Sequence, residues 1–216
     1  LHRVDRRQRQ MCIRDRWDVM RYDQQGCYSP HVFYVQRGGP VSPRDFAGYL
    51  AGELSNLQRR FPRRALDLEE SAAVAKWRQS IEWTLTPDGA DALIGDMETA
   101  WSVAYVDKAP SLAPTALQRS ITVAGIDALD EVAPQVAARR EFLQTAGVAA
   151  TPEELYRLAE QLGAAGVTRV SAIGAMSVPE AGWHHDGRFN LLDLVRMTEI
   201  EQSAEAAADP FASYEP

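Results

Sequence analysis

Apolar residues follow two patterns along this chain, and each pattern predicts a different kind of element. Short runs of consecutive apolar residues predict buried strands, whereas apolar residues repeated every three or four positions predict helices packed on one side. We expect strands at 31–36, 101–106, 120–126, 142–146 and 167–174. We expect helices at 42–61, 66–81, 128–136, 152–166 and 191–200, followed by a frayed tail.

Two of the expected helices have a clear start signal. Ser42 before Pro43 suits an N-cap with proline in the first turn, where its missing N–H costs nothing. The segment 151–154, Thr-Pro-Glu-Glu, is a full capping box with proline at the first helical position. Both signals fix the point at which a helix should begin.

Strands and helices alternate through most of the chain. The strands are short apolar runs rather than alternations of polar and apolar residues, which is typical of a sheet covered on both faces. The sequence therefore predicts an α/β fold with a mostly parallel sheet flanked by helices.

The first sixteen residues have a different origin from the rest. Residues 6–16, RRQRQMCIRDR, match a translated reading frame of a Tn5-transposase sequencing adapter. The competing explanation is a basic arm for nucleic acid or a targeting peptide. We therefore divide the chain into a non-native segment at 1–16, a main part at 17–200 and a flexible tail at 201–216. The abrupt start at Trp17 suggests a reading frame truncated on its N-terminal side.

The net charge of the remaining chain bears on which kinds of partner it can bind. Residues 1–16 contain six arginines and two acidic residues, so the rest carries 17 basic and 28 acidic residues, a net charge of −11. An acidic surface repels phosphate backbones, so we expect no nucleic acid partner. No apolar run approaches the roughly 20 residues of a membrane helix, so we expect no membrane span.

The cysteine content bears on both compartment and chemistry. Cys12 lies in the adapter segment, which leaves Cys27 as the single native cysteine. One cysteine cannot form an internal disulfide or a thiolate metal cluster, so we expect a cytoplasmic protein. A lone cysteine is either a small buried residue or a nucleophile, and both explanations are open at this point.

The neighbours of Cys27 favour the nucleophile. The segment 22–35, YDQQGCYSPHVFYV, places Cys27 directly after Gly26, at a turn just ahead of a predicted strand. Glycine lets the backbone bend sharply and lets a substrate approach the sulfur closely. Backbone N–H groups around Cys27 would then be able to stabilise an oxyanion.

This segment resembles the acyl-CoA reductase family that supplies fatty aldehyde to bacterial luciferase. Members carry a DQQ-(Ala/Gly)-C-x-S-P motif around an acylated cysteine, and residues 23–30 match it. The resemblance continues through an R-x-I-x-V strand at 119–123, a G-V-x-R-V run at 166–170 and a D-L-V-R segment at 193–196. It covers nearly all of residues 17–200.

The resemblance implies an aldehyde-dehydrogenase-like catalytic domain with Cys27 as the acyl-accepting nucleophile. The thiolate would attack the thioester of an acyl-CoA or acyl-carrier protein, and NADPH would then reduce the acyl-enzyme to a fatty aldehyde. Luminescence is one setting for such enzymes, and a homo-oligomer is an open alternative to a monomer. We take five residues as candidate contacts to substrate or cofactor: Gln25, Gly26, Ser29, Arg119 and His185.

The chain departs from the aldehyde dehydrogenase pattern in its cofactor machinery. Generic members hold the nicotinamide ribose with a glutamate just ahead of the 120–126 strand, where this chain has Gln118-Arg119-Ser120. Arg119 is therefore considered as a phosphate contact instead. No G-x-G-x-x-G follows a strand, and the GAAG at 163–166 falls at a helix end. We expect the N-terminal nucleotide-binding domain and the general base to be absent, and this chain to be inactive alone.

A second polar cluster lies at 183–187, Trp-His-His-Asp-Gly. Adjacent residues point apart, and no further cluster completes a ligand set, so we expect no metal site there. His185 is instead considered as a residue of the substrate pocket.

Two other classes of function are consistent with the same residues. One is a cysteine hydrolase or acyltransferase that pairs Cys27 with His31 or His185. The other is a non-catalytic interaction domain whose single thiol is buried.

Overall fold

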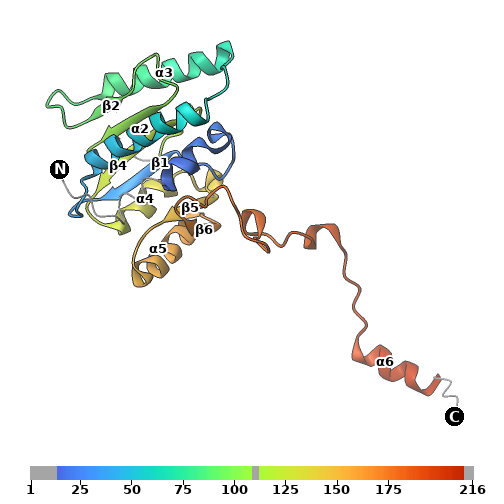
Figure 1. Cartoon of the computed structure of the whole chain (residues 1–216). Helices are drawn as coiled ribbons and strands as arrows, with labels where there is room; N and C mark the ends of the chain where they lie inside the picture. Colours follow the sequence, from blue (N-terminus) through green and yellow to red (C-terminus); the bar gives the residue numbers. More distant parts are fainter. Residues whose placement is uncertain (1–13, 109–111, 212–216) are drawn as a thin grey trace. The chain divides into compact units, whose positions relative to one another are not determined.

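We describe a computed structural model of the chain, which covers residues 14–108 and 112–211 (Figure 1). Most of the expected adapter segment, residues 1–13, lies outside the described residues, as do residues 109–111 and the last five residues of the expected tail. The chain divides into two units, the first ending at Trp183 and the second beginning at His184.

The first unit contains two sheets. The larger has the strand order β1-β4-β3-β2, in which β1 and β3 both run parallel to β4, and only β2 is antiparallel to its neighbour. The smaller sheet is a parallel pair of β5 and β6. The strands are β1 (Val32–Gln36), β2 (Ala92–Ile94), β3 (Ser102–Val106), β4 (Ser120–Ile126), β5 (Thr145–Val148) and β6 (Arg169–Ala172). The predicted α/β fold with a mostly parallel sheet is confirmed.

Helix α2 (Pro43–Arg60) covers one face of the larger sheet. It begins where predicted, because the Ser42 side chain accepts a hydrogen bond from the Asp45 N–H and Pro43 occupies the first turn. Its apolar stripe of Phe46, Leu50 and Leu54 packs in one cluster with side chains of all four strands.

The opposite face is covered by α3 (Leu68–Thr84) and by α4 (Val132–Ala137) with α5 (Pro152–Ala165). The Arg78 guanidinium of α3 donates to the hydroxyl of Ser102, whose side chain lies on the face away from α2. Leu158 and Leu162 of α5 pack with Ile126 of β4 in a second apolar cluster. The helices therefore flank the sheet on both sides, as predicted.

Helix α5 confirms the second start signal. The Thr151 side chain accepts from the Glu154 N–H, and the Glu154 carboxylate accepts from the Thr151 N–H. The helix ends at Gly166, whose φ of +119° is a left-handed conformation that favours glycine.

A helical segment at 14–20 packs against the end of the smaller sheet. The Asp18 carboxylate accepts from the N–H groups of Gly174, at 2.6 Å, and Met176, at 3.1 Å. Asp15 is buried without a hydrogen bond to either carboxylate oxygen from any described residue. Burial, with the nearby charge of Asp18 in second place, raises the pKa of the Asp15 carboxyl well above its usual range.

Three expectations for the first unit need correction. Strand β2 was not expected, because its three residues are too few to show a pattern. The strand expected at 142–146 begins only at Thr145, after a 3-10 turn at Arg140–Phe142. The strand expected at 167–174 is limited to Arg169–Ala172.

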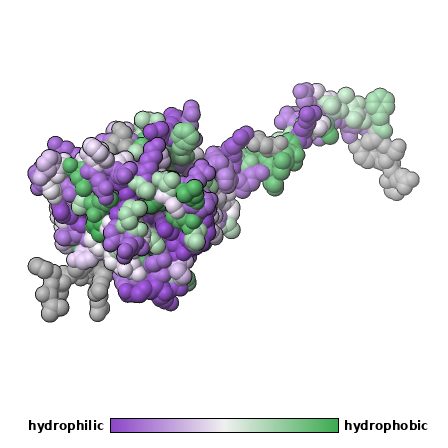
Figure 2. Space-filling model, turned by 90° about the horizontal axis from the view of Figure 1, so that it is seen from above, coloured by the Kyte–Doolittle hydropathy of each residue, from purple (hydrophilic) through white to green (hydrophobic). Residues whose placement is uncertain are grey.

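The second unit contradicts the expected helix at 191–200. Only a 3-10 turn, Leu192–Leu194, forms there, and helix α6 (Gln202–Ala208) lies in the segment expected to be frayed. The large apolar side chains of 191–200 are exposed, which Figure 2 shows as green surface along this segment. A helix of that length is stable mainly through burial of one face, and this segment has no such burial.

No helix within the described residues combines the length and the apolar character needed to cross a lipid bilayer.

Candidate functional site

Cys27 is exposed and lies in a tight turn directly ahead of β1. The turn is closed by the Ser29 N–H, which donates to the Gly26 carbonyl at 2.9 Å. Cys27 and Ser29 both line a cavity of about 400 Å³ whose other lining residues are mostly apolar. The thiol is therefore presented to solvent at the mouth of an apolar cavity, and it is not a buried core residue.

Gly26 lies close to the ring of Tyr28, a side chain that can turn away, and its own backbone dihedrals do not favour glycine. A Cβ at Gly26 would lie 2.6 Å from Cε2 of the Tyr28 ring, and the φ of Gly26 is not in the left-handed region. The sharp bend that we expected at glycine lies earlier, at residues 22–24. Tyr22, Asp23 and Gln24 all have positive φ, between 49° and 63°.

Gln24 fixes the turn to the sheet. Its side-chain amide donates to the Pro30 carbonyl at 2.8 Å and to the Ser120 carbonyl at 3.0 Å. Gln24 is 1% exposed, so both bonds are protected from water. The amide thereby joins both ends of the cysteine turn to the start of β4.

Asp23 and Arg119 form a second connection to the same strand. The Arg119 Nε donates to the Asp23 carboxylate at 2.7 Å, and the Gln118 N–H donates to the Asp23 carbonyl at 2.9 Å. Nη1 of Arg119 also donates to Gln58 Oε1 and to the Phe61 carbonyl. Arg119 is 5% exposed, so its guanidinium is satisfied inside the protein. This placement favours a positioning role over the phosphate contact that we considered.

Residues 117–119 repeat the unusual backbone of 22–24. Leu117, Gln118 and Arg119 have φ values of 59°, 54° and 67°. Non-glycine residues in this conformation cost about 1 kcal/mol or more each, so they persist only where surrounding contacts over-determine them. The Asp23–Arg119 pair and the Gln24 bonds are such contacts, and they link the two strained segments to each other.

Gln25 faces a charged group on the outer side of the turn. Its amide donates to Glu70 Oε1 at 3.4 Å, and the Gln118 amide donates to the same oxygen at 2.9 Å. Hydrogen bonds from Arg64, foremost, and from the Asp67 N–H lower the pKa of Glu70 to about 2. The Glu70 carboxylate therefore stays charged and holds both glutamines.

His31 lies on the wall of the same cavity as Cys27. The Thr115 N–H donates to its Nδ1 at 3.1 Å, so this nitrogen acts as the acceptor of a neutral ring. Burial lowers the pKa of His31. His185 belongs to the second unit, where its Nδ1 lies 2.8 Å from the Asp186 carboxylate. Gly26, Cys27 and Ser29 lie together in the cysteine turn. His185 lies in the second unit and stays a separate candidate for contact with the substrate.

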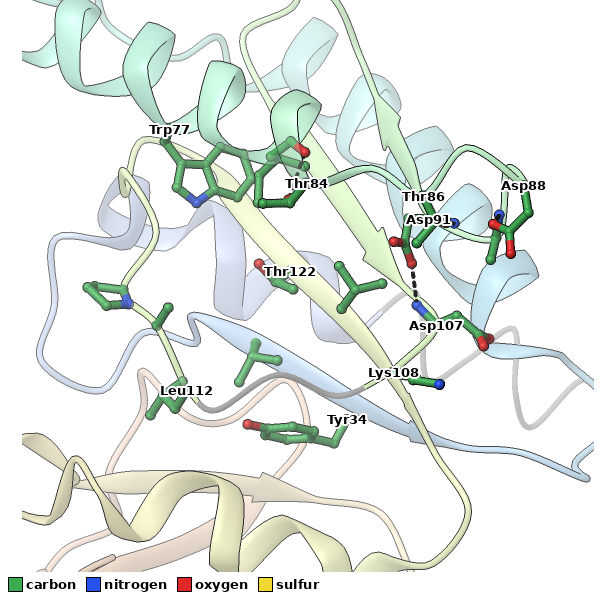
Figure 3. Close-up of a pocket in the computed structure, with 16 residues that line it drawn as sticks. Tyr34, Trp77, Thr84, Thr86, Asp88, Asp91, Asp107, Lys108, Leu112 and Thr122 are labelled. Carbon is green, nitrogen blue, oxygen red and sulfur yellow. Dashed lines mark hydrogen bonds between the residues drawn. The ribbon is translucent and has the colours of Figure 1, made fainter.

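A second cavity, of about 460 Å³, lies on the sheet face opposite α2 (Figure 3). Trp77 of α3 and Tyr34 of β1 face it from opposite sides, and Thr122 of β4 lies between them. Burial raises the pKa of Tyr34 to about 12. Its lining contains neither cysteine nor histidine, whereas the lining of the first cavity includes Cys27 and His31.

The sequence predicted Cys27 and its turn, but it did not predict the hydrogen bonds that fix this turn to β4. Asp23 and Gln24 are part of the motif, yet nothing in the sequence indicated that their partners are Arg119 and Ser120. Among the residues that the structure describes, no group of three or more His, Cys, Asp or Glu is placed to hold a metal ion.

The fold and the site define an α/β protein with an exposed thiol at a turn before a parallel strand, beside an apolar cavity. The sequence model of the acyl-CoA reductase (LuxC) family matches residues 9–197, and the chain belongs to this family. No curated protein gives a significant match.

Proposed function

We propose that this chain is the cysteine-bearing part of an NADPH-dependent reductase that converts acyl-CoA to fatty aldehyde through an acyl group on Cys27. The main support is the exposed Cys27, held at the mouth of an apolar cavity within the region that the acyl-CoA reductase family matches. The aldehyde-dehydrogenase-like character of the domain is part of this proposal.

The acyl transfer step uses the residues of this chain. The Cys27 thiolate attacks the thioester carbonyl, a sulfur–carbon bond forms, and the bond to the CoA sulfur breaks as CoA leaves as a thiolate. One thioester replaces another, so the step is close to thermoneutral. The substrate is an acyl-CoA or an acyl-carrier protein.

The turn offers two backbone donors for the oxyanion of this step. Within the described residues, the N–H of Ser29 is already taken by the Gly26 carbonyl, whereas no described residue accepts from the N–H groups of Cys27 and Tyr28. Donors fixed in place before the reaction stabilise a developing charge most effectively. The Gln24 and Asp23–Arg119 contacts supply that fixation.

The hydroxyl of Ser29 is a further polar group at the site. It is buried, it lines the same cavity as Cys27, and no described residue hydrogen-bonds to it. A buried hydroxyl without a partner costs free energy, so it is well suited to bind a polar atom of a ligand.

NADPH supplies, when bound, the hydride that converts the acyl thioester to aldehyde and returns the thiol. The described residues contain no glycine-rich loop between a strand and a helix that would hold its phosphates, since Gly163 and Gly166 lie at the end of α5. We therefore assign the dinucleotide site and the general base to a preceding part of the reductase and derive no hydride step from this chain.

The test extends the coding sequence upstream of Trp17 and measures NADPH oxidation and trapped aldehyde with a long-chain acyl-CoA. We expect reduction by the extended enzyme, none by the present chain, and a loss of at least about 10³-fold in the Cys27→Ser variant of the extended enzyme. A serine variant that reduces acyl-CoA as fast as its parent would rule the proposal out, as would hydrolysis without NADPH consumption.

A further inference from the structure

Positive charge is concentrated at the end of α2 and in the loop that follows it. The segment 59–64, RRFPRR, contains Arg59, Arg60, Arg63 and Arg64, which we call the arginine patch. The chain after residue 16 has 17 basic and 28 acidic residues, so four of its 17 basic residues fall within this one segment. A local excess of positive charge on an acidic protein favours an anionic ligand.

The arginine patch lies beside the cysteine turn, to which Glu70 connects it. The Gln25 amide donates to Glu70 Oε1 at 3.4 Å, and the Arg64 guanidinium donates to both oxygens of the same carboxylate. Gln25 precedes Cys27 by two residues. The patch therefore begins next to the thiol and extends from there to Arg59 in the last turn of α2.

Arg63 is half-buried in surroundings that disfavour its charge. Its Nη1 donates to the Gln118 carbonyl at 3.0 Å, and its Nε is buried without a hydrogen bond to any described residue. Burial, foremost, and the nearby charge of Arg119 lower the pKa of the Arg63 guanidinium. An anion beside this guanidinium would offset the cost of its burial.

Most of the charge of the arginine patch is not neutralised by carboxylates. Arg64 is paired with Glu70, but no described carboxylate forms an ion pair with the other three arginines. Arg59 and Arg60 are exposed. Arginine guanidinium groups match the geometry of phosphate oxygens and bind them through paired N–H groups. The patch thus has the charge and the donors that phosphate groups require.

An exposed aromatic ring lies in the middle of the arginine patch. The Phe61 side chain is 42% exposed, and the guanidinium carbon of Arg60 lies 5.6 Å from the centre of its ring. Aromatic rings beside positively charged side chains bind nucleotides, because the base stacks on the ring while the cations hold the phosphates. This combination fits a phosphorylated nucleotide better than a simple anion.

We propose that the arginine patch binds the phosphate groups of the coenzyme A moiety of the substrate, with the adenine against Phe61. The inference rests on the proposed function, in which Cys27 attacks an acyl-CoA thioester. Coenzyme A carries its phosphates at the adenosine end and its sulfur at the far end of the pantetheine arm. A phosphate site therefore belongs to one side of the thiol, and the patch begins beside the cysteine turn and leads away from it.

Isothermal titration calorimetry of free CoA into the present chain, under reducing conditions, tests the proposal. Pantetheine, which lacks the phosphates and the adenosine, should bind at least about tenfold more weakly than CoA. The double variant Arg59→Gln/Arg60→Gln and the single variant Arg63→Gln should each raise the Kd for CoA at least about tenfold. Arg63→Lys keeps the charge and should raise the Kd less than Arg63→Gln does.

The double variant Arg139→Gln/Arg140→Gln is the matched control. This exposed pair of neighbouring arginines lies elsewhere on the first unit, where the two guanidinium groups donate to the carbonyls of Leu112 and Ala164. The change in net charge equals that of the double variant in the patch, and distant charges are screened, so the Kd for CoA should stay within about twofold of the parent value. Urea denaturation of each variant verifies that it is folded.

Three results would overturn the proposal. The first is a Kd for CoA that is the same in the patch variants and the control variant. The second is no binding of CoA by the parent. The third is binding of NADP+ but not CoA, lost in the same patch variants, which would assign the patch to a dinucleotide phosphate.

The proposed function is tested separately on the same samples by the formation of a palmitoyl adduct on Cys27 with palmitoyl-CoA. An adduct on Cys27, together with CoA binding that is unaffected in the patch variants, would reject the phosphate site and leave the proposed function intact. CoA binding that depends on the patch, without any adduct on Cys27, would reject the acyl transfer and leave the phosphate site intact.

Discussion

At the scale of single residues, the reactivity of the site depends on the exposure of the Cys27 thiol to solvent. An exposed thiol reacts with alkylating reagents in the folded state, whereas a buried one reacts only after denaturation. The exposure of Cys27 thus argues against the interaction domain with a buried thiol.

We predict that iodoacetamide labels Cys27 in the folded chain at a rate within about tenfold of that in urea. Peptide mapping by mass spectrometry distinguishes Cys27 from Cys12, and the Cys27→Ser variant is the control. Labelling of Cys27 only after denaturation would contradict the exposed turn.

His31 makes the stability of the fold depend on pH. Burial lowers its pKa below the ordinary value near 6.5, so the unfolded chain binds a proton at higher pH than the folded chain does. The free energy of unfolding is therefore unaffected by His31 above about pH 6.5, and it falls by up to about 1.4 kcal/mol per pH unit below that value.

We predict that His31→Gln removes this part of the pH dependence. Urea denaturation of the parent and the variant between pH 5 and pH 8 gives the free energy of unfolding of each. The contributions of Asp15 and Asp18 are the same in both proteins, so the difference between the two free energies reports His31 alone. If the free energy of unfolding of the parent falls no faster below pH 6.5 than that of the variant, His31 is not buried in its neutral form.

At the scale of elements, the contacts between the cysteine turn and β4 decide the geometry of the site. The Asp23–Arg119 pair is largely buried, and removal of one partner leaves an uncompensated charge. We predict that Arg119→Met destabilises the protein by about 3 kcal/mol and that it also slows acylation of Cys27 by acyl-CoA, because the backbone donors of the turn are no longer held in place.

The exposed pair Arg157–Asp130 provides a matched control. Its Nε–Oδ1 distance is 3.2 Å, but both side chains are about half exposed. Arg157→Met should change the free energy of unfolding by less than about 1 kcal/mol and leave Cys27 reactivity unchanged. Similar losses in the two variants, measured by urea denaturation, would reject the proposed role of Arg119.

The elements that sequence predicted well are those with strong local signals. Ser42 and Thr151 marked helix starts correctly, and the apolar runs around β1, β3 and β4 gave their strands within one or two residues. The three-residue β2 carries no periodic signal. The positive φ values at Leu117–Arg119 were not predictable, because none of these residues is glycine and long-range contacts to Asp23 hold them.

At the scale of the whole molecule, the two units differ in how they are stabilised. The first unit has two apolar clusters, whereas the described side chains from His184 onward are exposed. Exposed segments contribute little to the free energy of unfolding.

We predict that truncation after Trp183 changes the free energy of unfolding by less than about 1 kcal/mol. Urea denaturation followed by tryptophan fluorescence measures it, since all five tryptophans are retained. A large loss of stability would show that the second unit contributes to the core.

The central claim is that Cys27 accepts an acyl group from acyl-CoA, and intact-mass spectrometry tests it most directly. The extended reductase is incubated with palmitoyl-CoA in the absence of NADPH and then with hydroxylamine, which cleaves thioesters. We predict one palmitoyl adduct that maps to Cys27, is removed by hydroxylamine and does not form in the Cys27→Ser variant. No adduct, or the same adduct on the serine variant, would contradict the account.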